Sequence, residues 1–163
     1  ALALGVLAAP AQAAPPKPGT LVVPTQFPTI QSAVDAAAPG ATIQILAGTY
    51  TEQVRIAKSL TVAGAGMDAT VIKAPAALQR DNKTKETNIV DISGGASVSM
   101  SRLTVAGPGS GTCKKGALSA GIRVRGEANL DLRFAAVRDI HDTPFAGCFH
   151  TAEGILVGDV PGP

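Results

Sequence analysis

Two stretches of the chain repeat the same order of apolar and polar positions. They are residues 90–105 and 122–137, and each position of the first has its counterpart 32 residues later. The matched apolar pairs are Val90 with Ile122, Ile92 with Val124, Val98 with Leu130, Met100 with Leu132 and Val105 with Val137. The matched polar pairs are Ser97 with Asn129, Ser99 with Asp131 and Ser101 with Arg133. A fixed repeat of this kind predicts a solenoid whose stacked coils bury a continuous core.

Short segments with alternating apolar and polar residues continue this pattern on both sides of the two copies. A third copy begins at Ile155 and Val157, which follow Ile122 and Val124 by 33 residues. The segments have the usual length of strands, and no helical pattern long enough for a crossover lies between them. Asn-Gly and Asp-Gly hairpin turns are also missing between them. We therefore expect parallel strands, about 4.8 Å from one coil to the next.

Some details of the strand pattern are specific enough to check. Residues 96–101 and 102–107 are expected as separate strands, and so are residues 128–133 and 134–140. Tyr50 is expected in a packed turn. Asp91 and Arg123 occupy matched outward positions, so we expect an ion pair between them on the surface.

A helical pattern precedes the strands. Thr29 is a suitable N-cap residue, and Pro39 with Gly40 ends the pattern. The apolar face comprises Ile30, Ala33, Val34 and Ala37. A helix this short needs packing to be stable, so we expect it to cover the first coil as an N-terminal cap.

The first residues indicate export. An apolar stretch ends in Ala11-Gln12-Ala13, like a secretory signal cleaved after Ala13, and it is too short to span a membrane. A buried apolar helix over residues 1–9 is the alternative. We expect a signal remnant over 1–13, a linker over 14–20 and a solenoid over 21–163, truncated at its C-terminus. The expected location is secreted, periplasmic or at the cell surface.

The composition indicates the kind of core and argues against nucleic acid as a partner. Of the 163 residues, 45% are hydrophobic but only 3% are aromatic, so the core must consist of small aliphatic side chains. The 14 basic and 12 acidic residues are interspersed, with a net charge of +2. This distribution lacks the basic patch of a nucleic-acid-binding protein.

The two cysteines, Cys113 and Cys148, each precede a Gly-Ile strand, so we expect them to lie close together. In an exported chain they favour a disulfide, which contributes about 4 kcal/mol for a loop of this length on the chain-entropy estimate. Two buried free thiols, or a metal site shared with His150, are the alternatives.

Acidic and histidine side chains gather further along the chain. Asp139, His141 and Asp142 share one loop, where they can ligate a cation, act as acid and base on a sugar, or simply form a solvated turn. Asp131 faces outward from a strand and can contact a substrate or merely keep the surface soluble.

Longer segments resemble a known superfamily. "FPTIQSAVDAAAPGATIQILAGTYTEQVRI" and "SLTVAGAGMDATVI" resemble the opening of right-handed parallel β-helix proteins of the pectin-lyase-like superfamily, and residues 89–158 resemble bacterial β-helix repeat proteins. The resemblance runs from Pro24 to the end of the chain. It implies an all-β, right-handed parallel β-helix with a short N-terminal helix. Enzymes and non-enzymes share this opening, so it implies fold more than reaction.

Pectinesterases give the nearest enzymatic comparison. In "IHDTPF" Asp142 matches their pattern, whereas His141 replaces a Gln, and Ser119 with Ala120 stands where another Gln would be. The resemblance implies a protein that binds carbohydrate or cell-envelope polymer through loops between coils. The alternative is a polysaccharide lyase or carbohydrate esterase with further residues in later coils. The expected catalytic residues are then Asp142 and His141, and the expected substrate-binding residues are Asp139, Asp131 and His150. No cofactor is expected, except Ca²⁺ for a lyase.

We predict that the purified, denatured protein contains no free thiol before reduction, because we expect Cys113 and Cys148 to form a disulfide. Titration with a thiol reagent checks this, with the reduced chain as the control. Two reactive thiols per unreduced chain would contradict the disulfide.

Overall fold

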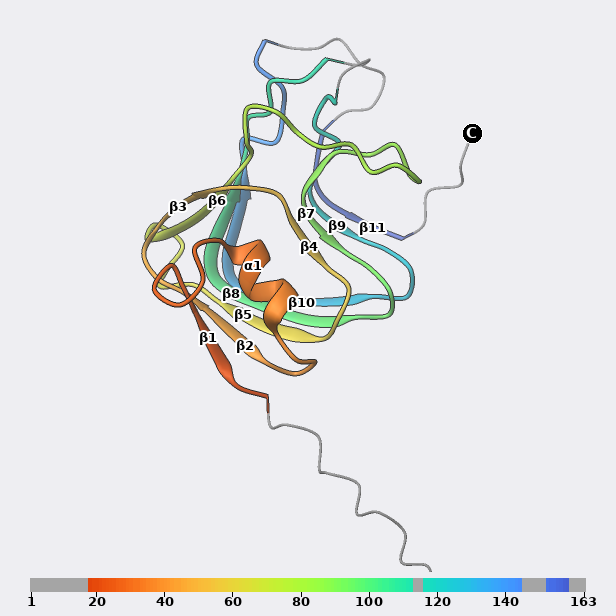
Figure 1. Cartoon of the computed structure of the whole chain (residues 1–163). Helices are drawn as coiled ribbons and strands as arrows, with labels where there is room; N and C mark the ends of the chain where they lie inside the picture. The colour runs from red at the N-terminus through yellow and green to blue at the C-terminus, as the bar shows by residue number, and fades with distance from the viewer. Residues whose placement is uncertain (1–17, 113–115, 145–151, 159–163) are drawn as a thin grey trace, which may run out of the picture.

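The chain winds in coils around an aliphatic core, and strands of successive coils pair in parallel (Figure 1). The computed structural model describes residues 18–112, 116–144 and 152–158. The elements are β1 (Thr20–Val23), α1 (Ile30–Ala36), β2 (Thr42–Ile45), β3 (Gly48–Thr51), β4 (Val54–Ile56), β5 (Leu60–Ala63), β6 (Thr70–Lys73), β7 (Asn88–Ile92), β8 (Ser97–Ala106), β9 (Ala120–Val124), β10 (Asn129–Arg138) and β11 (Glu153–Val157).

Two sheets form the walls of the solenoid. Sheet A has the order β1-β2-β5-β8-β6-β3, with β10 also paired to β8, and sheet B has the order β11-β9-β7-β4. All strand pairs between the described residues are parallel. The prediction of stacked parallel strands is confirmed.

The 32-residue repeat is the register of the sheets. Val90 pairs with Ile122 and Ile92 with Val124 in sheet B, while all three expected pairs between β8 and β10 occur in sheet A. The third copy is also in register, since Ile155 lies beside Ile122. Val90, Ile92 and Ile122 are fully buried. Each such side chain contributes roughly 1.5–3 kcal/mol relative to exposure, so these inward columns dominate the stability of the fold.

Strands β8 and β10 each bend once and continue beyond the bend within sheet A. The first half of β8 pairs with β5 and its second half with β6. The bends occur at Arg102, with φ of 55°, and at Phe134, with φ of 48°. The expectation of two separate strands on either side of each bend was therefore wrong. A single left-handed residue turns the chain while the ladder resumes immediately beyond it.

Tyr50 lies in strand β3, not in a turn as expected. β3 pairs with β6, with Tyr50 beside Ile72. The Tyr50 hydroxyl donates to the carbonyl oxygen of Leu46 at 3.0 Å. Burial, followed by the charge of Glu52, raises the pKa of this phenol.

Helix α1 forms where the sequence predicts it. Thr29 is its N-cap, in a capping box with Ser32. The carboxylate of Glu52 accepts the N–H groups of Ile30 and Gln31, each at 2.9 Å. The helix contacts β1, β2 and β4, which ties it to the first coil (Figure 1). In the described part of the chain, no helix has the length and apolar character needed to cross a bilayer.

We predict that Ile122→Ala lowers the free energy of unfolding by about 2–5 kcal/mol, because it leaves a cavity in the middle of an inward column. Denaturant titration measures the change. Thr51→Ala is the control, since Thr51 is exposed in β3 and its substitution is expected to change the free energy of unfolding by less than about 0.5 kcal/mol. Equal losses for the two variants would contradict the assignment of the core.

Candidate functional site

A shallow depression of about 270 Å³ lies on the outer side of sheet A. Its lining comes from the turn before β2 and from the outer faces of β5, β8 and β10. The lining residues are Gly40, Ser59, Leu60, Thr61, Ser97, Val98, Ser99, Asn129 and Asp131. The surface of the depression is mainly carbon, and the polar side chains of the lining lie around it. We call Ser59, Thr61, Ser97, Ser99, Asn129 and Asp131 the hydroxyl surface.

The parallel register builds this surface. Thr61, Ser99 and Asp131 occupy one outward column, because Thr61 pairs with Ser99 and Ser99 with Asp131. Asn129 pairs with Ser97 in a second column. Since outward positions recur every second residue along a strand, the two columns run side by side. The same stacking that builds the core therefore repeats short polar groups at each coil.

Few of these polar groups are engaged elsewhere. The Ser59 hydroxyl accepts the Ser97 N–H at 3.0 Å. Asp131 accepts from Nε of Arg133 at 2.9 Å, and this bond raises the pKa of the Arg133 guanidinium. Both side chains are more than half exposed, so the pair contributes little to stability. Within the described ranges, no hydrogen bond of the Thr61 or Ser99 hydroxyl is found. Free hydroxyls of this kind both donate and accept, as a hydroxyl-rich ligand requires.

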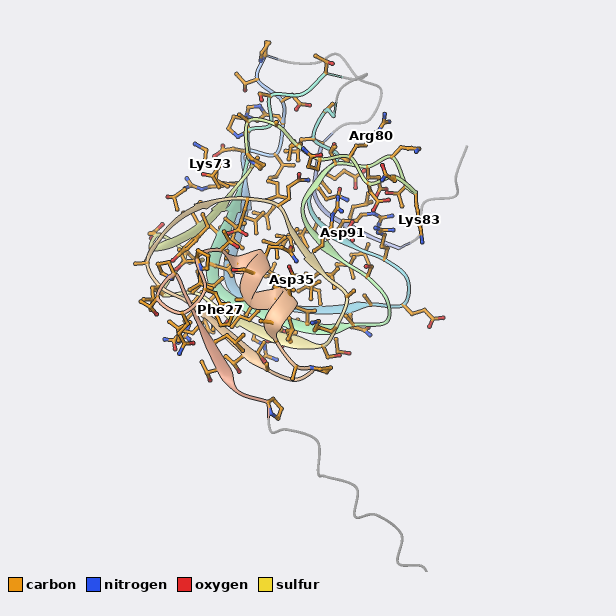
Figure 2. All side chains as sticks on the ribbon, in the orientation of Figure 1. Phe27, Asp35, Lys73, Arg80, Lys83 and Asp91 are labelled. Carbon is orange, nitrogen blue, oxygen red and sulfur yellow. The ribbon has the colours of Figure 1, made fainter. Side chains whose placement is uncertain are left out.

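A second polar cluster covers the outer side of sheet B. Arg125 Nη2 lies 3.2 Å from Asp91 Oδ2 and 3.3 Å from Asp81 Oδ2. Arg123 Nε lies 2.9 Å from Glu86 Oε2. Asp81 and Glu86 belong to the loop of residues 74–87, which follows β6 and returns over the sheet. Figure 2 shows Asp91 on the side of the molecule that also carries Lys83 of this loop.

The expected surface pair of Asp91 with Arg123 was wrong in its partners and in its exposure. The two residues are register neighbours, as expected. However, their side chains are only 9% and 2% exposed, and each binds a different partner. The loop brings carboxylates that the strand pattern does not reveal. Removing one partner of such a buried pair typically costs about 3–5 kcal/mol, so the Arg123–Glu86 pair fastens the loop to the sheet.

Further hydrogen bonds of this cluster reach the backbone and a neighbouring side chain. Arg123 Nη1 donates to the carbonyl oxygen of Gly158 at 2.5 Å, beyond the next strand. Asn88 donates from Nδ2 to Asp91 at 3.3 Å, while its buried Oδ1 has no partner among the described residues. The guanidinium of Arg123 thus joins the loop and two coils.

The electrostatics of the loop favour a charged Asp81. The backbone N–H of Thr84 donates to this carboxylate and is the main cause that lowers its pKa, against the opposing effect of burial. The N–H of Lys83 and the charge of Arg125 lower it further. For Arg125, burial alone would lower the pKa, but the bonds and charge of Asp91 outweigh burial and raise it.

The loop with Asp139, His141 and Asp142, which the sequence singled out, follows β10 and is separate from the charged cluster on sheet B. Asp142 is 9% exposed, and both of its carboxylate oxygens accept the N–H of Leu118, at 3.1 and 3.2 Å. His141 is exposed, with Nδ1 3.3 Å from the Thr143 hydroxyl. Asp139 is exposed and has φ of 57°. The Asp142 carboxylate therefore fastens one loop to the next, while His141 and Asp139 face solvent.

The structure separates the predicted site residues into two groups. Asp139, His141 and Asp142 follow the second half of β10, whereas Asp131 lies in its first half and joins the hydroxyl surface. Cys113, Cys148 and His150 lie outside the described residues. Within the described ranges, no three His, Cys, Asp or Glu side chains gather in a way that could hold a metal ion.

We predict that the 74–87 loop loosens in acid. The folded pKa of Asp81 lies below its ordinary value of 3.8, so its contribution to stability is present above that pH and is lost as the pH falls through the folded pKa. Hydrogen exchange of the loop, expressed as protection relative to the intrinsic rate at each pH, measures the effect from pH 6 down through the folded pKa. In Asp81→Asn the protection should be lower at pH 6 and change less on acidification. The exposed Asp68→Asn is the control, and an unchanged profile in Asp81→Asn would contradict the assignment.

Comparisons with known proteins support the fold. No protein-family model matches the sequence, and no curated protein matches it. A pectin methylesterase variant in complex with a hexasaccharide matches with a TM-score of 0.57 at 15% identity, over 90% of this chain and 49% of that one. A second pectin methylesterase complex with a hexasaccharide matches with a TM-score of 0.58 at 15% identity, over 89% and 46%. The chain thus spans about half the length of these structures. At this identity the likeness shows the fold alone, which is a parallel β-helix.

Proposed function

We propose that this protein is an exported β-helix that binds a polysaccharide or cell-envelope polymer along its hydroxyl surface. The observation that carries the proposal is the row of short polar side chains across β5, β8 and β10. A linear polymer lying across the coils meets a similar set of donors and acceptors at each one.

The chemistry of the surface suits a weak, repeated interaction. A single hydrogen bond contributes only about 0.5–1.5 kcal/mol net, so one coil alone binds poorly. Three coils supply Thr61, Ser99 and Asp131 in one column, with Ser97 and Asn129 beside them. The carboxylate of Asp131 accepts strongly from sugar hydroxyls, while the serine and threonine hydroxyls adapt to donors or acceptors.

The comparisons support a carbohydrate as the class of ligand. Both matched structures are pectin methylesterases in complex with hexasaccharides, which favours a polysaccharide over a protein or nucleic acid as the partner. Export, as expected from residues 1–13, would place the protein where such polymers occur. In this proposal α1 is an N-terminal cap that shields the first coil, through its contacts with β1, β2 and β4.

A carbohydrate esterase or lyase is the second candidate. It is favoured by the likeness to pectin methylesterases and by the Asp91–Arg125 pair on the outer side of sheet B. Two structural features weigh against it. Asp91 lies under the 74–87 loop, and the Asp142 carboxylate is engaged by the Leu118 N–H. A catalytic role for Asp142 with His141 would require the loops around them to rearrange.

Binding to a glycan array, followed by titration with soluble hexasaccharides of pectin, cellulose and chitin, tests the proposal. The double variant Ser99→Ala/Asp131→Ala should weaken binding about tenfold or more, because about 1.4 kcal/mol corresponds to a factor of ten. Thr49→Ala, which removes an exposed hydroxyl from β3, is the matched control and should bind like the wild type.

Absence of binding to every glycan, or equal affinity of the double variant, would overturn the proposed site. Assays for ester release and for unsaturated products on the same substrates distinguish the enzymatic alternative. Turnover that is lost in Asp91→Asn or Asp142→Asn would favour an enzyme.

A further inference from the structure

Phe134 occupies a position that is unfavourable in two ways. Its side chain is 76% exposed, the highest fraction among the large apolar side chains in the described part of the chain. Its backbone is left-handed, with φ of 48°. This conformation costs an L-residue roughly 1–2 kcal/mol, and for a bulky residue it is a genuine outlier. The phenyl ring therefore neither packs in the core nor eases the turn.

The corner itself does not require an aromatic residue. Arg102 has the same left-handed conformation one coil earlier. It is the equivalent position, since Ser101 pairs with Arg133 and Leu103 with Ala135. Gly64 approaches the corner in the coil before that, where an added Cβ would collide with the Arg102 carbonyl oxygen. Arginine and phenylalanine both adopt the left-handed conformation, whereas Gly64 does not. Glycine or asparagine would adopt this conformation at lower cost at position 134.

The position of Phe134 relates it to the hydroxyl surface. Phe134 follows Asp131 by three residues on β10, a distance of about 10 Å along the strand. A polymer that crosses the coils at the hydroxyl surface and turns along β10 beyond Asp131 therefore reaches the corner. Arg102, also exposed, lies one coil away and offers guanidinium donors there.

An exposed phenyl ring near a guanidinium group suits contact with a sugar ring. A pyranose presents C–H groups on its faces and hydroxyls at its edge, so an exposed ring can stack on the face while polar groups bind the edge. We propose that Phe134 is a stacking platform for one sugar ring of a polysaccharide held on the hydroxyl surface, with Arg102 binding the hydroxyls at the edge of that ring. This inference rests on the proposed function.

Substitution of Phe134 distinguishes a role in binding from a role in folding. Phe134→Asn and Phe134→Gly should bind the hexasaccharide that the wild type prefers about tenfold more weakly, while their stability in denaturant titration stays equal or rises as the backbone strain is relieved. A merely structural role predicts the reverse, with lower stability and unchanged affinity. Arg102→Gln should weaken binding by a smaller factor.

A fluorescent variant reports on the position of the sugar. The chain contains no tryptophan, so Phe134→Trp introduces the only indole signal. Saturation with the same hexasaccharide should shift or change this emission, with a midpoint equal to the wild-type Kd. Phe27→Trp, at a partly buried position packed against the core, is the control and should not respond.

The outcomes distinguish the two proposals. If Ser99→Ala/Asp131→Ala loses binding but Phe134→Asn does not, and the indole emission of Phe134→Trp is unchanged at saturation, the stacking platform is wrong and the hydroxyl surface stands. If none of the hexasaccharides or array glycans binds the wild type, both are wrong.

Discussion

The parallel register between successive coils is the constraint on which this structure depends. Each strand is hydrogen-bonded to the strand one coil away, so side chains at matched positions stack. Val90 lies on Ile122 and Val98 on Leu130, and the core is the sum of such columns. A slip of one residue would turn every inward aliphatic side chain outward. Because burial of each contributes about 1.5–3 kcal/mol, the core holds the register in place.

The same register produces two different outer surfaces. On sheet B it aligns charged residues, and the 74–87 loop supplies carboxylates that neutralise them in a nearly dry environment. Such charges are tolerated there only because each has a partner, so this surface is committed to structure. On the first half of β8 and β10 it aligns serine, asparagine and aspartate, which remain at the surface. The charge pairs of sheet B are used within the protein, whereas the short polar side chains on sheet A remain accessible to a ligand.

The sequence predicted the features that depend on a repeating order of apolar and polar residues. The repeat between residues 90–105 and 122–137 predicted the parallel pairs and the core, and it placed Ser99 beside Asp131. Strand β3 was not predicted because its sequence, GTYT, does not alternate apolar and polar residues and only Tyr50 is partly buried. The bends at Arg102 and Phe134 lack the glycine or asparagine that usually marks a left-handed residue. The Glu86–Arg123 pair depends on the path of a loop, for which the sequence has no periodic signal. The disulfide of Cys113 with Cys148 and the role of His150 stay predictions.

Cross-linking of introduced cysteines measures the register directly. Opposed residues of adjacent parallel strands lie about 4.8 Å apart, within the range that a disulfide spans. The pair Ser101→Cys/Arg133→Cys, opposed in β8 and β10, should oxidise to a bond identified by peptide mass spectrometry. The pair Ser101→Cys/Asn129→Cys is displaced by four residues, about 13 Å along the strand, and should not. Efficient bonding of the displaced pair, or none of the opposed pair, would contradict the stacking of coils from which the core and both surfaces follow.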